Sequence, residues 1–315
     1  DETYRSVGQQ TTTASLTDSV QHYVYENGRR YHSYYGVDKN LLPTDEIEQD
    51  RMDLYHEILL RQLDGRLHLA PIGQYPQRIL DIGTGTGIWA IDMADRYPSA
   101  EVIGTDLSPI QPKWVPPNCK YEVDDAELEW TYAENSFDFI HARNLGQSID
   151  DWHSMLQQAY RCLEPGGFIE LAEIGGVSYS DDGSLTPDNP LNIFGQKLQE
   201  AMVVMGRPAH MTDTFLRDQL VGAGFVDVVV AARAKQPHAP WAREKHFKEI
   251  GSMVLLSNET GFDAYGLAAF TRILGMSKRE AQGVCKDALT AVRNKNLHSY
   301  NIFYVVYGRK PEPDE

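Results

Sequence analysis

The sequence has few basic residues and no long apolar run. It holds 29 Lys and Arg against 45 Asp and Glu, a formal net charge of −16, and a surface of that sign repels phosphate backbones and anionic headgroups. No apolar run approaches the roughly 20 residues of a membrane span, and no signal-peptide pattern lies near the start. We therefore expect no direct nucleic-acid binding, no transmembrane segment and an intracellular protein of the cytoplasm or nucleus.

Cysteine is also scarce. The three cysteines, Cys119, Cys162 and Cys285, lie far apart and form no CxxC pair or His-containing pattern with zinc-site spacing. We predict reduced structural cysteines and no metal site. The hydrophobic content of 42% is ample for a buried core.

The N-terminal part divides into two predicted segments. Residues 1–20 are rich in Thr, Ser and Gln without apolar periodicity, which predicts a flexible lead-in. Residues 21–315 are predicted to form a single domain, beginning with a helical N-terminal extension over 21–70. The clearest helix there spans Asp45 to Leu63, where apolar residues recur at helical spacing.

After residue 70 the pattern changes to short apolar runs separated by helical stretches. Strands are predicted at 78–83, 101–108, 119–125, 137–143 and 168–174, with helices at 86–97 and 149–163. Strands alternating with helices indicate an α/β fold with a mostly parallel sheet covered on both faces. We expect the segment 71–180 to be the cofactor-binding core.

The C-terminal part is less regular. Residues 181–300 are predicted to be helical insertions around a sixth strand, and residues 301–315 a final strand and tail. The predicted helices are 187–205, 213–223, 241–256 and 262–293, and the predicted strands are 226–234 and 301–310.

A glycine-rich turn follows the first predicted strand of the core. In open α/β sheets, ligands bind outside the carboxyl ends of the strands, and residues 81–87 read DIGTGTG there. Gly83 and Gly85 let a ligand approach the backbone closely, with Asp81 just before them. A dinucleotide fingerprint needs glycine where Ile88 stands, so NAD is disfavoured. A plain tight loop remains the alternative.

Polar residues follow the next three strands. Asp106 is placed to accept hydrogen bonds from both hydroxyls of a ribose; the alternative is a helix N-cap. Asp125 suits the amino group of adenine, beside which Ala126 leaves room for the ring; the alternative is a solvated acidic turn. Arg143 is suited to a carboxylate, and His141 is either a base or a buried structural histidine.

These residues, taken in order, resemble the seven-strand S-adenosylmethionine-dependent methyltransferases, and more narrowly the fungal LaeA-like group. The segments that carry the resemblance are ENGRRYHSY (26–34), LLPTDEIEQDRMDLYHEILL (41–60), ILDIGTGTGIWAIDMADRYPSAEVIGTDLSPIQPKWVPPN (79–118), FDFIHARNLGQSIDDW (137–152) and LEPGGFIELAE (163–173). The resemblance implies a Rossmann-like, seven-stranded sheet of order 3-2-1-4-5-7-6 with the last strand antiparallel.

The resemblance also implies the cofactor and its contacts. S-adenosylmethionine is the expected cofactor and S-adenosylhomocysteine the product. By position, methionine lies near Gly83, Thr84 and Gly85, and ribose on Asp106. Adenine lies by Leu107, Asp125 and Ala126, and Tyr31 resembles a residue that folds over the cofactor.

The function implied is methyl transfer, linked to fungal secondary metabolism or developmental regulation, to a small-molecule or protein acceptor. No catalytic residue is assigned, because displacement at a sulfonium mainly requires alignment in a dry site. The alternative is a cofactor-binding regulatory subunit that acts through a partner such as a second methyltransferase or a regulatory subunit. An NAD-dependent oxidoreductase is disfavoured by Ile88 and by the lack of a recognisable Tyr-x-x-x-Lys pair.

Overall fold

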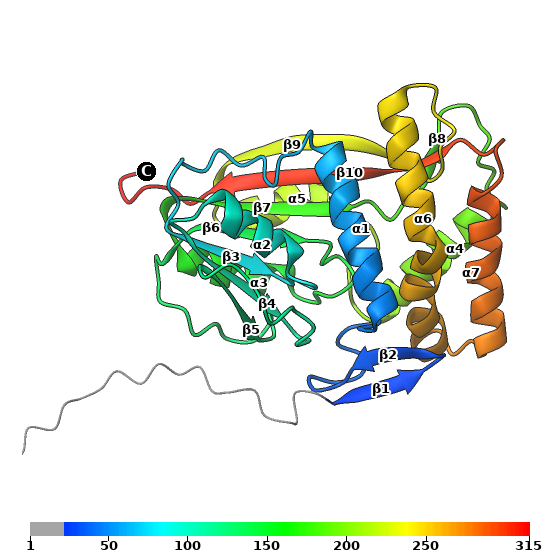
Figure 1. Cartoon of the computed structure of the whole chain (residues 1–315), viewed down its shortest axis with the longest axis horizontal. Helices are drawn as coiled ribbons and strands as arrows, with labels where there is room; N and C mark the ends of the chain where they lie inside the picture. Colours follow the sequence, from blue (N-terminus) through cyan, green and yellow to red (C-terminus); the bar gives the residue numbers. More distant parts are fainter. Residues whose placement is uncertain (1–21) are drawn as a thin grey trace, which may run out of the picture.

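A sheet of seven main strands and one two-residue strand forms the centre of the computed structural model, which describes residues 22–315 (Figure 1). The expected flexible lead-in, 1–20, lies outside the described residues. The strands stand in the order β5-β4-β3-β6-β7-β10-β9, with bounds Cys119–Val123, Glu101–Asp106, Arg78–Ile82, Phe137–Arg143, Leu163–Ile174, Ser299–Arg309 and Val226–Pro237.

The pairing confirms the predicted topology. Strands β3 to β7 pair in parallel, whereas β10 runs antiparallel to both β7 and β9. Numbered along the chain as seven strands, this order is 3-2-1-4-5-7-6. A two-residue strand, β8 (Tyr179–Ser180), adds to one end of β10.

Helices cover both faces of the sheet. Successive residues of a strand point to opposite faces, and these strands carry apolar side chains on both. Leu80 on β3 packs with α3 (Trp152–Cys162) and α5 (Asp213–Gly222), whereas its neighbour Ile79 packs on the opposite face with α2 (Ile88–Arg96). On that second face α1 (Glu46–Gln62) lies against β7 and β10. Two-sided burial explains why these strands read as nearly continuous apolar runs.

The expected helical extension over 21–70 is corrected at its start, where the structure has a β-hairpin. Strands β1 (Tyr23–Glu26) and β2 (Arg29–His32) pair antiparallel. Asn27 and Gly28 both have positive φ, 56° and 87°, as a two-residue hairpin turn requires. Asn-Gly between two strand-like segments is a recognisable hairpin signal, and the sequence analysis missed it.

The hairpin is tied to the start of α1. The Asp45 carboxylate caps α1 by accepting from the Glu48 backbone N–H at 3.1 Å, and it also accepts from the Arg29 guanidinium at 2.7 and 2.8 Å. One carboxylate therefore fixes the hairpin and the helix together.

The C-terminal helices also differ from the prediction. Besides α4 (Pro190–Val204), a single helix α6 (Lys245–Ala268) continues into one π-helical segment, η2 (Ala269–Ile273), before α7 (Lys278–Val292). The break expected at 257–261 is therefore wrong, and it lies near Gly275 instead, whose φ is 66°. Ser257 and Gly261 are buried, so their small size serves packing rather than a loop, and Ser277 with Glu280 forms the capping box of α7.

Helices α4, α6 and α7 gather at one end of the sheet, with α1 between them and the core (Figure 1). None of the helices within residues 22–315 is long and apolar enough to cross a membrane.

Candidate functional site

The glycine-rich turn after β3 has the backbone that its sequence predicts. Gly83, Gly85 and Gly87 have φ of 64°, 59° and 81°, a region that L side chains rarely adopt. A Cβ at Gly83 would lie 2.3 Å from Leu145 Cδ2, and one at Gly87 would lie 2.2 Å from the Tyr121 hydroxyl. The turn is thus closely packed on one side, while Gly83 and Gly85 line a cavity on the other.

Asp81 lies beneath this turn and holds it. Its carboxylate accepts a hydrogen bond from Thr84 Oγ1 at 2.6 Å and lies 2.7 Å from His141 Nδ1. The His141 ring stacks on Trp89 with the centroids 3.8 Å apart, and burial lowers its pKa. The structural interpretation of His141 is therefore the one that the geometry favours, and neither Asp81 nor His141 lines the cavity.

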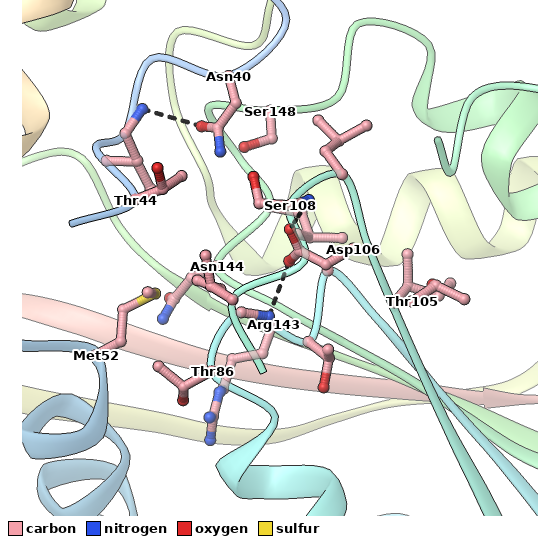
Figure 2. A pocket seen from close by; sticks show the side chains of 18 of the residues that line it. Asn40, Thr44, Met52, Thr86, Thr105, Asp106, Ser108, Arg143, Asn144 and Ser148 are labelled. Atoms are coloured by element: carbon pink, nitrogen blue, oxygen red, sulfur yellow. Dashed lines mark hydrogen bonds between the residues drawn. The ribbon is translucent and has the colours of Figure 1, made fainter. Parts of the chain in front are cut away.

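Asp106 lies at the end of β4 in the same cavity. Its Oδ2 accepts from Gly85 N–H at 2.8 Å and its Oδ1 from Ser108 N–H at 2.9 Å, as the dashed lines in Figure 2 show. Burial raises the Asp106 pKa to about 6, although these two hydrogen bonds stabilise the ionised carboxylate and lower the pKa. The N-cap alternative fails because the chain from 107 to 118 forms no helix, and each carboxylate oxygen keeps a second lone pair.

Asp125, after β5, is part of an ion-paired turn. The residue is 5% exposed, its Oδ1 accepts from Glu127 N–H at 3.0 Å, and its Oδ2 lies 3.0 Å from Lys39 Nζ. Lys39 also pairs with Glu127 at 2.7 Å. The solvated acidic turn is therefore wrong, and Lys39, from the segment before α1, is a site residue that the sequence analysis missed.

Arg143 lines the cavity from the end of β6. Its guanidinium donates to His56 Nδ1 of α1 at 3.3 Å, and His56 Nε2 lies 2.9 Å from Asp92 of α2. In Figure 2 the guanidinium points away from Asp106. Arg143 thus connects the cavity floor to both α1 and α2.

The structure brings eight of the ten predicted cofactor residues into one cavity: Gly83, Thr84 and Gly85 after β3, Asp106 and Leu107 after β4, Asp125 and Ala126 after β5, and Arg143. Asp81 lies beneath them. Tyr31 does not join them, because its side chain is fully buried in a separate cluster with the helices around α6. Its ring instead faces the Arg272 guanidinium, 4.5 Å away.

A second cavity adjoins the first, and the two share five lining residues: Leu42, Arg51, Tyr55, Asn144 and Tyr265. Its other walls come from α4, α6 and the ends of β7, β9 and β10. The empty space within it, including its open mouth, is about 1240 Å³. Tyr55 and Tyr265 lie in helices far apart in the sequence, and no local pattern reveals that they meet at this junction.

Comparison with known proteins identifies the family. A family model described as a methyltransferase domain matches residues 51–230. The methyltransferase pytC of Aspergillus terreus is 38% identical over 310 residues, which cover 97% of this chain and 94% of pytC. The secondary metabolism regulator LAE1 of Cochliobolus heterostrophus is 37% identical over 91% of this chain and 94% of LAE1. The chain belongs to the LaeA-like methyltransferases.

Further relatives of this LaeA-like methyltransferase include the secondary metabolism regulator laeA of Aspergillus fumigatus, 36% identical over 91% of the chain and 76% of laeA. Among solved structures, Haemonchus contortus phosphoethanolamine N-methyltransferase 2 in complex with S-adenosylmethionine has a TM-score of 0.46 and 22% identity. That match covers 88% of this chain and 55% of the other.

Two buried glutamates on β7 support the loops around the site of this LaeA-like methyltransferase. Glu170 accepts from the backbone N–H groups of Leu69 and Ala70 at 2.7 and 2.6 Å. Glu173 accepts from those of Leu145 and Gly146 at 2.6 and 3.2 Å. Burial raises the pKa of Glu170 to about 7 and that of Glu173 to about 8.

These glutamates make the stability of the ligand-free protein depend on pH. Each pKa is higher in the folded than in the unfolded state, so protonation favours folding, and the stabilisation is lost as pH rises through about 7 and about 8. Burial lowers the pKa values of His141 and His238. Below pH about 6.5 these two histidines therefore make the free energy of unfolding rise with pH, opposite to the effect of the glutamates.

We therefore expect the free energy of unfolding to fall between pH 6.5 and about 8, by up to about 1.4 kcal/mol per pH unit for each group. Urea unfolding across this range measures it. Glu173→Gln should flatten the upper part of the curve, whereas Glu164→Gln, at an exposed position, should leave it unchanged. A Glu173→Gln curve as steep as that of the wild type would contradict the prediction.

Proposed function

We propose that this LaeA-like methyltransferase binds S-adenosylmethionine in the first cavity and transfers its methyl group to an acceptor in the second. The donor set of the first cavity fits that cofactor. The Asp106 carboxylate has lone pairs for two ribose hydroxyls, and the absence of side chains at Gly83 and Gly85 leaves the backbone open to a ligand. Ser108 lines this cavity, and its Oγ is buried without a hydrogen-bond partner in the described residues, a partner that a polar ligand would supply.

The residues take distinct roles in this proposal. Gly83, Thr84 and Gly85 border the methionine part, with Asp81 orienting Thr84, and Asp106 holds the ribose. Leu107 and Ala126 enclose the adenine, and Asp125 accepts from its amino group. Arg143 is the cationic group on the cavity floor, suited to the cofactor carboxylate.

The bound cofactor supplies a methyl group already activated on a sulfonium. The chain therefore needs to orient the acceptor and to exclude water. The shared side chains Leu42, Tyr55 and Tyr265 lie where the two cavities meet, so they are suited to both tasks.

The observation that carries the proposal is the Asp106 carboxylate, held by Gly85 and Ser108 in a cavity that shares five lining residues with a second one. Isothermal titration calorimetry on the full chain tests it, with S-adenosylmethionine and NADH as the two ligands. We expect binding of S-adenosylmethionine alone, because Ile88 replaces the third glycine of the dinucleotide fingerprint. Tight binding of NADH would overturn the assignment.

A role in regulating secondary metabolism is the second candidate, since LAE1 and laeA are named as secondary metabolism regulators. Methyl-labelled cofactor, incubated with the protein and a cell extract that is then separated into proteins and small molecules, distinguishes the candidates. Label in either fraction supports a methyltransferase acting on that class. Tight cofactor binding with no label in either fraction would favour a regulatory subunit that works through a partner.

A further inference from the structure

Three amide side chains that line the second cavity each have a buried polar atom that nothing in the described chain satisfies. Asn144, Gln147 and Asn258 line it, and Asn144 Oδ1, Gln147 Oε1 and Asn258 Nδ2 have no hydrogen-bond partner within residues 22–315. A buried polar group without a partner is costly, and natural structures rarely keep one without a reason. Three such side chains on one cavity wall point to a ligand that supplies the missing partners when these amide groups turn toward it.

The charged and titratable side chains of the cavity are already engaged. Arg51 is paired with Glu48 at 2.6 and 2.9 Å, and Glu173 is held by two backbone N–H groups. His238 Nδ1 lies 3.0 Å from Ser299 Oγ, and its Nε2 contacts Asn301. Among the described residues, therefore, the charged side chains of this wall are committed to the protein.

Much of the remaining wall is apolar, and the uncharged polar residues Ser178, Gln199, Gln236, Ser257 and Asn301 complete it. The apolar part includes Leu191, Phe194, Met202, Met211, Val254 and Phe262. An ionised ligand would lose its hydration here without gaining a free counter-charge, and that loss is expensive. The wall favours an uncharged molecule with a large apolar surface.

Asn144 stands where the two cavities meet, and its backbone is held on both sides. Its φ is 56°, in the left-handed region that Asn adopts more readily than most residues, and its N–H donates to Ala172 O at 3.0 Å. Glu173 fixes the two residues that follow it. These contacts keep the Asn144 side chain at the junction of the two cavities.

We infer that the second cavity binds an uncharged, largely apolar small molecule that carries an O–H or N–H group and an oxygen acceptor. With these amide groups turned toward the cavity, the O–H or N–H group donates to the amide oxygen of Asn144 or Gln147, and the oxygen accepts from the Asn258 amide. If the proposed function holds, this molecule is the methyl acceptor, and the group on Asn144 lies beside the cofactor cavity. A protein side chain as the acceptor is the competing outcome.

Matched probes test the polar part of this inference. We would titrate the full chain with 2-naphthol, 2-methoxynaphthalene and 2-naphthoate at pH 7, with saturation-transfer NMR as the readout. Naphthol carries the O–H group, the ether lacks it, and naphthoate is charged. We expect naphthol to bind at least fivefold more tightly than either of the others. Equal binding of the ether, or tighter binding of naphthoate, would overturn the inference.

A cavity-filling variant tests the location. A Cβ at Gly195 of α4 would have its nearest neighbour, Gly176 O, at 3.7 Å, so Gly195→Leu projects into the cavity and also suits a helix. Gly283 of α7 has nothing within 4 Å of such a Cβ and does not line the cavity. We expect Gly195→Leu to weaken naphthol binding at least tenfold and Gly283→Leu to leave it unchanged. Unchanged binding in Gly195→Leu would exclude this cavity.

Asn258→Leu separates a ligand-binding role from a structural one. Because the Asn258 Nδ2 atom lacks a partner, we expect the Tm of the ligand-free variant to stay equal or rise, while naphthol binds several-fold more weakly and the ether binds as before. A lower Tm with unchanged naphthol binding would assign Asn258 to the fold.

Calorimetry with S-adenosylmethionine runs in parallel, so a chain that binds naphthol but not the cofactor rejects the proposed function and keeps this inference.

Discussion

Asp106→Ala should weaken S-adenosylmethionine binding by about 1–3 kcal/mol, roughly 5- to 150-fold in Kd. The wild-type carboxylate has lone pairs left for the ribose hydroxyls after accepting from Gly85 and Ser108. Alanine removes that charged acceptor and also releases the two backbone N–H groups that shape the cavity. Calorimetry at constant pH and salt measures the change.

Asp50→Ala is the matched control for this experiment, because Asp50 is an exposed residue of α1. Its affinity should equal that of the wild type. Circular dichroism of both variants shows whether the fold is kept. If folded Asp106→Ala bound the cofactor as tightly as the wild type, Asp106 would not belong to the cofactor site.

Gly251→Ala should destabilise the protein by about 1–3 kcal/mol, although alanine is the better helix former. A Cβ at Gly251 in α6 would lie 2.2 Å from the Ala239 carbonyl oxygen and 2.6 Å from its carbon. These are backbone atoms, so relief requires moving α6 away from the segment after β9. Denaturant unfolding gives the free energy, and the second cavity should lose ligand affinity with it.

Gly283→Ala, in contrast to Gly251→Ala, should stabilise the protein. Open space surrounds a Cβ there, so alanine in α7 should add about 0.5–1 kcal/mol to the free energy of unfolding. Equal gains in both variants would mean that α6 does not press on residues 239–240.

The core of the fold was predictable because its signals are local. Each parallel strand is an apolar run bounded by turn residues, and the positive φ values of Gly83 and Gly85 belong to the turn that the DIGTGTG segment predicts. The predicted cofactor residues after β3, β4 and β5 lie in one cavity, as expected from the rule that ligands gather at the carboxyl ends of such strands.

The rest depends on contacts between distant segments. Lys39 reaches Asp125 across 86 positions of chain, and Tyr265 joins the site from α6; neither position carries a local signal. Tyr31 was assigned by resemblance alone, and burial against the helices around α6 keeps it from the cavity. The α6 boundary was misplaced because buried Ser257 and Gly261 look like loop residues in a sequence.

The side chains common to both cavities have a thermodynamic consequence. Leu42, Arg51, Tyr55, Asn144 and Tyr265 border each of them, so a ligand that fixes these side chains on one side alters the affinity on the other. Linkage makes that effect reciprocal: the factor by which one ligand changes the affinity for the second equals the factor by which the second changes the affinity for the first. The side chains shared by the two cavities are therefore where any cooperativity between two ligands would arise.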